Sequence, residues 1–166
     1  MILVTGASGH IGNTLVRELL AHGETVKGLV LPGEDRTSLD GLDIEVVEGN
    51  VLDPRSLGDA FRNVHIVYHL AGIISIMPGK NERMWQVNVQ GTRNVIEAAM
   101  QAGVRRMVHT STIHAFKRPP DGVVMDETLP FDPHNPYGEY DRSKAAASIE
   151  VLNAVKQGLD AVIVCP

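Results

Sequence analysis

The chain opens on Ile2-Leu3-Val4-Thr5-Gly6-Ala7-Ser8-Gly9-His10-Ile11-Gly12, and this stretch decides the fold. Its first residues form a short apolar run typical of a strand, and residues 11–21 carry apolar side chains at helical spacing. Three glycines lie between these two elements. A tight turn there needs residues without a Cβ, because backbone N–H groups must stay open to a phosphate group. The stretch therefore predicts a strand, a phosphate-binding turn and a helix.

The same alternation continues along the chain. Short apolar runs predict strands at 2–5, 25–31, 44–48, 64–70, 104–110 and 161–165, and longer patterns predict helices at 11–21, 54–62, 82–102 and 137–157. Residues 113–135 carry four prolines and little periodicity, which predicts a long loop. Repeated strand–helix alternation predicts an α/β fold, a doubly wound parallel sheet of the Rossmann type with about six strands and helices on both faces.

The composition excludes several classes of protein. The net charge of −5 shows no basic stripe, so nucleic acid is not an expected partner. No apolar run reaches the ~18 residues of a membrane helix, and the first residues do not form a signal peptide. A single cysteine, Cys165, permits no internal disulfide and favours the cytoplasm. The seven histidines show no metal-ligand spacing, so we expect no metal site.

Residues 1–166 are interpreted as one nucleotide-binding domain. The last strand carries the apolar run Val162-Ile163-Val164, which needs cover on both faces, and no segment follows to supply it. We therefore expect a chain truncated from a longer protein, with a C-terminal substrate domain absent from it.

The glycine turn is the predicted binding site of a dinucleotide. The helix amino terminus adds unpaired N–H donors and a favourable dipole. An ordinary glycine-rich connection is the alternative, but the strand before the turn and the helix after it favour pyrophosphate binding. The predicted contacts are Gly6, Ser8, Gly9, His10, Ile11 and Gly12.

Four further motifs follow the glycine turn. They are Val67-Tyr68-His69-Leu70-Ala71-Gly72, Asn88-Val89-Gln90-Gly91-Thr92, Thr110-Ser111-Thr112 and Tyr140-Asp141-Arg142-Ser143-Lys144. Together with Thr5-Gly6-x-x-Gly9-x-x-Gly12, these motifs resemble the extended short-chain dehydrogenase/reductase family over essentially the whole chain. That family includes nucleotide-sugar epimerases and dehydratases and dihydroflavonol-reductase-like enzymes.

The resemblance implies more cofactor contacts. It matches Asn50 and Val51 to contacts with the adenine. After the fourth predicted strand, small residues would let the cofactor pass close to the backbone, and the matching positions are Leu70, Ala71 and Gly72.

The resemblance also implies catalytic roles. Tyr140 would exchange a proton with a substrate hydroxyl while hydride passes to or from the nicotinamide, and Lys144 would hold the nicotinamide ribose. Thr112 would hydrogen-bond the reacting oxygen, because a hydroxyl both donates and accepts. Asn88 matches a structural or catalytic asparagine, and a helix asparagine that bonds locally is the alternative.

Tyr140 and Lys144 lie four residues apart on one predicted helix, so their side chains share a face. A phenol with a pKa of ~10 is a poor base, and a nearby ammonium lowers that pKa. Lowering it by about three requires roughly 4 kcal/mol from the lysine and the cofactor charge. Tyr137 is the competing candidate, but it has Asp141 and no cation at the fourth position.

The end of the second strand normally separates NAD from NADP. An acid there binds the ribose hydroxyls of NAD, and an arginine accepts the extra phosphate of NADP. This chain has Val30-Leu31-Pro32-Gly33, which offers neither. Arg36 is a candidate for binding the phosphate, and the acidic turn Gly33-Glu34-Asp35 is predicted to be solvated surface. The predicted cofactor is NAD or NADP, undecided.

These observations lead to the hypothesis of an NAD(P)-dependent oxidoreductase acting on a small molecule. It is either a sugar-nucleotide epimerase or dehydratase, or a ketone or aldehyde reductase. We expect the 166-residue chain alone to be inactive, and the intact protein to dimerise through the helices at 82–102 and 137–157. A non-catalytic NAD(P)-binding sensor or scaffold is the alternative. Such relatives usually lose the tyrosine or the lysine, and this chain has both.

Overall fold

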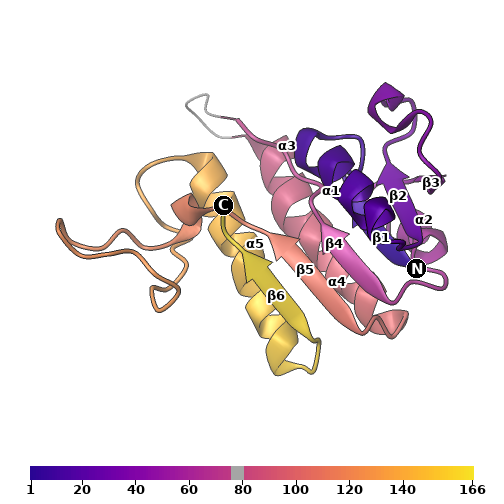
Figure 1. Cartoon of the computed structure of the whole chain (residues 1–166). Coiled ribbons are helices and arrows are strands. Elements are labelled where there is room, and N and C mark those ends of the chain that lie inside the picture. Colours follow the sequence, from indigo (N-terminus) through magenta and orange to yellow (C-terminus); the bar gives the residue numbers. More distant parts are fainter. Residues whose placement is uncertain (76–80) are drawn as a thin grey trace.

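Short apolar runs form six parallel strands in the computed structural model, which describes residues 1–75 and 81–166 (Figure 1). The strands are β1 (Ile2–Thr5), β2 (Val26–Val30), β3 (Glu45–Glu48), β4 (Ile66–His69), β5 (Arg106–Thr110) and β6 (Ala161–Val164). They lie in the order β3-β2-β1-β4-β5-β6. This is the strand order of a dinucleotide-binding Rossmann fold, so the predicted fold class is confirmed.

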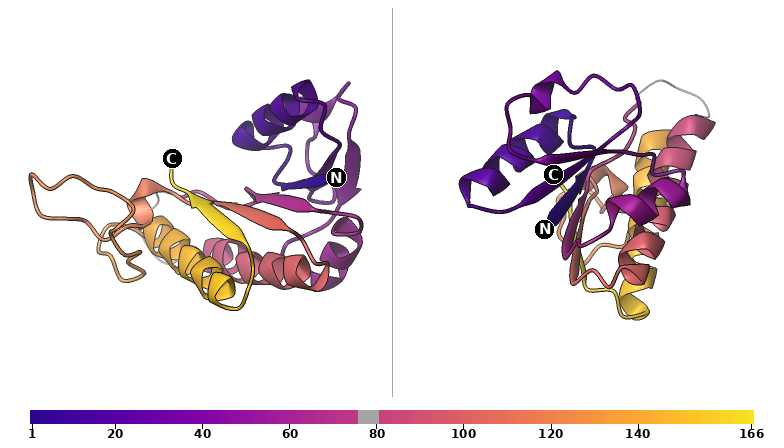
Figure 2. Two further views of the ribbon diagram at one scale, coloured as in Figure 1. Left: turned by 60° about the horizontal axis from the view of Figure 1, so that its bottom comes forward. Right: turned by 90° about the vertical axis from the view of Figure 1, so that its right-hand side faces the viewer.

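Helices cover both faces of the sheet. On one face α1 (His10–Ala21) and the short 3-10 turn η1 (Thr37–Leu39) pack on β1 and β2 through Val4, Val16, Val26 and Leu39. On the other face lie α2 (Pro54–Ala60), α4 (Gly91–Gln101) and α5 (Glu139–Lys156), whose apolar side chains meet those of β1, β4 and β5. Figure 2 shows α1 on one side of the sheet, with α4 and α5 side by side on the other.

The centre of the sheet is a topological switch point. β1 pairs with β2 on one side, Ile2 opposite Val26, and with β4 on the other, Ile2 opposite Ile66. From β1 the chain builds outward to β2 and β3, and then returns to the far side of β1 to build β4, β5 and β6. The connections beyond the carboxyl ends of β1 and β4 therefore diverge, and ligands of open α/β sheets bind in the crevice that results.

The helix predicted at 82–102 is not regular. It consists of α3 (Glu82–Trp85), a π-helical turn η2 (Gln86–Gln90) and α4. Gly91 follows the π-helical turn, and a Cβ there would lie only 2.7 Å from Val51 Cγ2. The missing side chain lets the helix pack against Val51, in the connection between β3 and α2.

The long loop predicted at 113–135 contains little regular structure. One 3-10 turn, η3 (Ile113–Ala115), follows β5, and an isolated bridge pairs Phe116 with Phe131. Their rings stack with centroids 4.7 Å apart. In Figure 1 the part of the loop between these two residues extends away from the sheet, and α5 begins after it.

Candidate cofactor and active site

The glycine turn has a geometry that side chains would prevent. Gly6 has a φ of +69°, and a Cβ on it would lie 2.9 Å from the backbone nitrogen of Ala71. A Cβ on Gly12 would lie 2.0 Å from the carbonyl oxygen of Gly6. Gly9 is the N-cap of α1 and no side chain caps this helix end, so its first N–H groups remain available to an anion.

Two hollows lie on either side of this turn. The strand-2 hollow, of about 210 Å³, is lined chiefly by Gly6, Gly9, Val30, Leu31, Glu34, Asn50, Val51, Leu70, Ala71, Gly72, Ile73 and Arg83. The Tyr140 hollow, of about 310 Å³, is lined by Gly6, Gly9, His10, Ile11, Gly12, Leu70, Gly72, Ile73, Ile74, Thr110, Ser111, Thr112, Tyr140, Lys144 and Pro166. The shared glycines join them into one site of the size that small molecules occupy.

A buried chain of hydrogen bonds lies beneath the turn. The Thr92 hydroxyl donates to the Asn88 carbonyl at 2.6 Å, so it accepts from His69 Nε2 at 2.9 Å. His69 Nδ1 then accepts from the Thr5 hydroxyl at 2.8 Å. Thr5 Oγ1 in turn accepts from the backbone N–H groups of Leu70 and Ala71. Each donor meets an acceptor, and the chain connects β1, β4 and the helix that carries Asn88.

Two buried imidazoles lie near Lys144. The rings of His69 and His109 are 5.4 Å apart, and both residues are 1% exposed. Burial, and then the charge of Lys144, lower the pKa of His69 to about 3. The same two causes, with a smaller one from His69, lower the pKa of His109 well below its ordinary value. Both rings are therefore neutral at physiological pH.

Lys144 is held at the end of β5. Its ammonium donates to the carbonyl oxygen of Thr110 at 2.6 Å. Burial lowers the pKa of Lys144 to about 8, so the group is mostly charged at neutral pH. Thr112 follows β5 as the N-cap of η3, and the hydroxyl of Ser111, between them, bonds to Ser148 of α5 at 2.7 Å. These contacts tie the end of β5 to α5.

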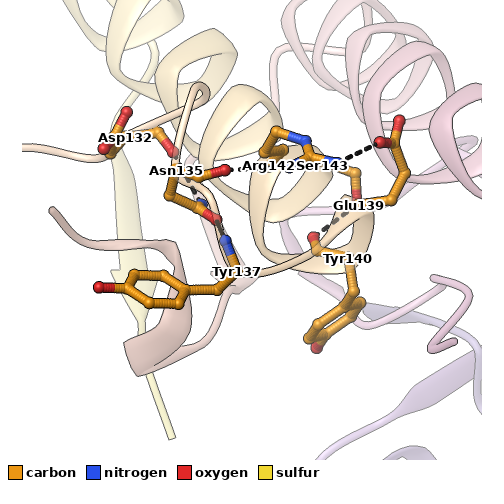
Figure 3. Close-up of polar contacts among 7 residues, drawn as sticks. All are labelled: Asp132, Asn135, Tyr137, Glu139, Tyr140, Arg142 and Ser143. Atoms are coloured by element: carbon orange, nitrogen blue, oxygen red, sulfur yellow. Dashed lines mark hydrogen bonds and ion pairs between the residues drawn. The ribbon is translucent and has the colours of Figure 1, made fainter. Parts of the chain in front are cut away.

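The two tyrosines near the start of α5 occupy different environments. Figure 3 shows their rings pointing in different directions. Tyr137 is 59% exposed and lies under the guanidinium of Arg118, 5.7 Å from the ring centroid. Tyr140 is half-buried and lines the Tyr140 hollow with Thr112 and Lys144. Tyr140, which the sequence favours, therefore lines the hollow, and Tyr137 does not.

The pKa of Tyr140 differs from the prediction. The predicted drop requires Lys144 and the cofactor charge together, whereas in the chain alone burial of the phenol, and then the negative charge of Asp141, raise its pKa above the ordinary value. The physical reason is that the Lys144 ammonium is directed to the carbonyl of Thr110, while the half-buried ring has lost much of its water. An unbound chain therefore holds Tyr140 as the neutral phenol.

Asn88 lies beside the hollows and does not line them. Its Oδ1 accepts from the backbone nitrogen of Ile73 at 2.8 Å, and its Nδ2 donates to the carbonyl of Ile73 and to Ser143 Oγ, both at 3.0 Å. Ser143 donates to the carbonyl oxygen of Tyr140, as Figure 3 shows. The side chain thus connects the segment after β4 with the first turn of α5.

Most of the predicted site residues line the two hollows. Ser8, Arg36 and Asn88 are the ones that do not. Arg36 instead forms an ion pair with Glu48 at 3.4 Å. The hydroxyl of Ser8 is buried and has no hydrogen-bond partner within the described residues. The lining residues that were not predicted from the sequence include Glu34, Arg83 and Ile73.

The sequence pair Pro32-Gly33 indicates that Glu34 lies near the end of β2. This pair predicts a tight turn, which returns residue 34 to the end of the strand. We predicted solvated surface for it instead. Glu34 is exposed, but it also lines the strand-2 hollow.

The residues present fit a dinucleotide. The turn has room only for backbone at Gly6 and Gly12, the N–H groups of α1 are open, and a hydroxyl without a partner among the described residues lies in the turn. Such a turn binds a pyrophosphate, and one hollow extends from it on each side, toward β2 and toward β5. Fold and site together define a dinucleotide-binding Rossmann domain.

The chain belongs to the NAD dependent epimerase/dehydratase family, whose model matches residues 2–166. The resemblance to the extended short-chain dehydrogenases/reductases is thereby confirmed. The family uses NAD, and solved neighbours contain it. The choice between NAD and NADP for this chain stays open.

Individual relatives cover the chain almost completely. It is 42% identical over 164 residues to "Sterol demethylase protein B" of Methylococcus capsulatus, covering 99% of this chain and 50% of that protein. It is 36% identical over 188 residues to "Cinnamoyl-CoA reductase 1" of Oryza sativa subsp. japonica, covering 100% of this chain and 52% of that protein. The structure of the UDP-glucose 4-epimerase of Thermus thermophilus, solved with NAD, matches this chain with a TM-score of 0.86 and 30% identity. The match covers 99% of this chain and 54% of the epimerase. The chain thus spans about half the length of these relatives.

Two further findings concern the described part of the chain. No helix in residues 1–75 and 81–166 is long and apolar enough to cross a membrane. The same residues contain no group of three or more histidine, cysteine, aspartate or glutamate side chains able to hold a metal ion.

Proposed function

We propose that this chain is the cofactor domain of an oxidoreductase that interconverts a hydroxyl and a carbonyl group on a small molecule. The observation that carries the proposal is the Tyr140 hollow, where Thr112, Tyr140 and Lys144 lie beside the glycine turn. Nicotinamide, when bound, supplies hydride transfer to or from the reacting carbon. The residues of the chain bind and orient the cofactor and the substrate, and they transfer the proton.

Tyr140 is the proposed acid and base. In reduction its Oη gives a proton to the carbonyl oxygen as hydride reaches the carbon, and in oxidation Oη takes the proton back. Thr112 Oγ1 donates to the same oxygen and holds it near Oη. Lys144, fixed by the Thr110 carbonyl, keeps further N–H groups for the nicotinamide ribose, and its charge stabilises the phenolate as it forms.

We favour a ketone or aldehyde reductase over a sugar-nucleotide enzyme. Two of the relatives reported above are named as a sterol demethylase protein and a cinnamoyl-CoA reductase, which supports this branch. A sugar-nucleotide epimerase or dehydratase is the second candidate, favoured by the family description and by the Thermus thermophilus neighbour. A sensor or scaffold without catalysis is less favoured, because Tyr140 and Lys144 are both present.

The full-length protein with Tyr140→Phe tests the proposal. Turnover should fall by about 10²–10⁴ because the acid–base group is lost. NADH absorbance follows it with a hydroxysterol and NAD or with cinnamoyl-CoA and NADH, and product analysis follows it with UDP-glucose, since epimerisation causes no net change in NADH. The Kd for NAD should change less than about threefold, since the ring keeps its shape. Tyr137→Phe is the matched control and should keep turnover, because Tyr137 lies outside the hollow. Full activity of Tyr140→Phe would contradict the proposal.

We also propose the arrangement of the whole protein. A substrate domain would follow residue 166, as the greater length of the relatives supports. A homodimer would form through α4 and α5, whose outer faces expose Met100, Leu152 and Val155. Sedimentation equilibrium of the full-length protein tests the dimer. Cys165 has no disulfide partner, which supports a reducing cytoplasm as the proposed location.

A further inference from the structure

We propose that Glu34 binds the adenosine ribose hydroxyls and makes this chain select NAD over NADP. The inference rests on the proposed function only in requiring a dinucleotide on the glycine turn. The inference goes beyond the proposed function because it assigns the choice between NAD and NADP to one side chain.

Glu34 is held at the carboxyl end of β2 by a tight turn. Gly33 has a φ of +75° and follows Pro32, the residue pattern of a type II turn. The backbone nitrogen of Glu34 donates to the carbonyl of Leu31 at 3.1 Å, and the nitrogen of Leu31 donates to Glu34 Oε2 at 2.9 Å. The two bonds fold the glutamate side chain back onto the end of the strand.

The carboxylate is placed where a ribose is expected. It lines the strand-2 hollow together with Gly6, Gly9, Leu31 and Asn50. In this fold the end of the second strand lies next to the adenosine ribose. Glu34 Oε1 makes no hydrogen bond within the described residues, so it remains free to accept from the ribose hydroxyls. Residue 31, at the end of the second strand, is a leucine rather than the acid that usually binds the ribose. Glu34 thus supplies the carboxylate instead.

The same carboxylate disfavours NADP. A 2′-phosphate brings about 1.5 to 2 negative charges to the position of one hydroxyl, where it would face Glu34. The nearby cations are held elsewhere, because Arg36 pairs with Glu48 at 3.4 Å and Arg17 donates to the Ser38 carbonyl at 2.8 Å. Neither arginine lines the strand-2 hollow.

One other cation requires its own test. Arg83 is the single lysine or arginine that lines the strand-2 hollow within the described residues, and it comes from α3 rather than from the β2–β3 segment. If Arg83 selected the cofactor instead, NADP would bind more tightly than NAD.

Calorimetric Kd values of the full-length protein for NAD and NADP test the inference. The unchanged protein should bind NAD at least about tenfold more tightly than NADP, which corresponds to about one charge-assisted hydrogen bond. Glu34→Gln should weaken NAD binding and bring the ratio close to one. Asp35→Asn is the matched control, because Asp35 bonds to Thr37 and lies outside the hollow, and it should leave the ratio unchanged.

Several results would overturn the inference. Tighter binding of NADP than of NAD would do so, and loss of that preference in Arg83→Gln would assign selection to Arg83. An unchanged ratio in Glu34→Gln would also contradict it. Equal binding of both dinucleotides removes this inference and leaves the proposed function standing, whereas absence of binding by either removes both.

Discussion

Single buried polar residues hold the candidate site together. The hydroxyl of Thr5 accepts two backbone N–H groups after β4 and donates to His69, which positions the segment from Leu70 to Gly72 against the glycine turn. Thr92 accepts from His69 and donates to the helix carbonyl of Asn88. Since a buried polar group without a partner costs about 1–3 kcal/mol, these pairings also specify one arrangement of the core.

His109 is the exception, because both of its ring nitrogens are buried without a hydrogen-bond partner in the described residues. His69 and His109 stay neutral in the folded chain, whereas an unfolded histidine gains its proton below a pKa of about 6.5. The unfolded state therefore binds more protons as the pH falls below about 6.5, and stability decreases by about 1.4 kcal/mol per pH unit for each histidine. For His69 this window ends at its folded pKa of about 3.

His109→Leu should remove one of these two contributions. The slope of the unfolding free energy between pH 6.5 and 5 should fall by about 1 kcal/mol per pH unit, because an unfolded histidine is half protonated at pH 6.5 and almost fully protonated at pH 5, with no loss of stability at pH 7. Urea unfolding at several pH values measures it. The control is His65→Gln, which removes a histidine from the exposed surface. An unchanged slope in His109→Leu would show that His109 is not buried as a neutral ring.

At the scale of elements, the π-helical turn η2 has a cause outside its own sequence. The apolar spacing of residues 82–102 predicts a helix. The same spacing is compatible with a regular helix and with a helix that contains one wider turn. What selects the wider turn lies outside the helix, in the bonds of Asn88 to Ile73 and Ser143 and in the packing of Gly91 against Val51. The periodicity of residues 82–102 does not depend on these contacts with distant residues, so the wider turn could not be predicted from the sequence.

Asn88→Ala tests whether the asparagine connects the elements. The change leaves the N–H and C=O groups of Ile73 without their partner, so the unfolding free energy should fall by about 2–4 kcal/mol. Chemical denaturation measures this loss. Asn153→Ala, on the exposed side of α5, is the control and should change stability by less than about 0.5 kcal/mol. A loss below about 1 kcal/mol for Asn88→Ala would argue against the connecting role.

For the whole molecule, the sequence predicted the sheet, the helices on both faces and most residues of the two hollows. It could do so because apolar periodicity and the glycine turn are local signals, and because repeated strand–helix alternation predicts a parallel sheet with helices on both faces. The position of Glu34 was not predicted, although Pro32-Gly33 predicts the turn, because the bond that folds its side chain back onto the end of β2 is a contact in the folded chain. The raised pKa of Tyr140 in the chain alone could not be predicted either, because the burial that causes it is set by tertiary packing.

The central claim is that the glycine turn binds the dinucleotide, and the Kd for NAD in Gly9→Ala tests it most directly. Gly9 has a φ of −69° and a Cβ there would lie 3.3 Å from the Gly6 carbonyl, so alanine fits with a small adjustment. The methyl group would occupy the approach of the pyrophosphate. Gly58→Ala, in α2 with open space around it, is the control. We predict that Gly9→Ala weakens NAD binding at least about tenfold with thermal stability retained, while Gly58→Ala binds NAD normally. Unchanged NAD affinity in a folded Gly9→Ala chain would contradict the account.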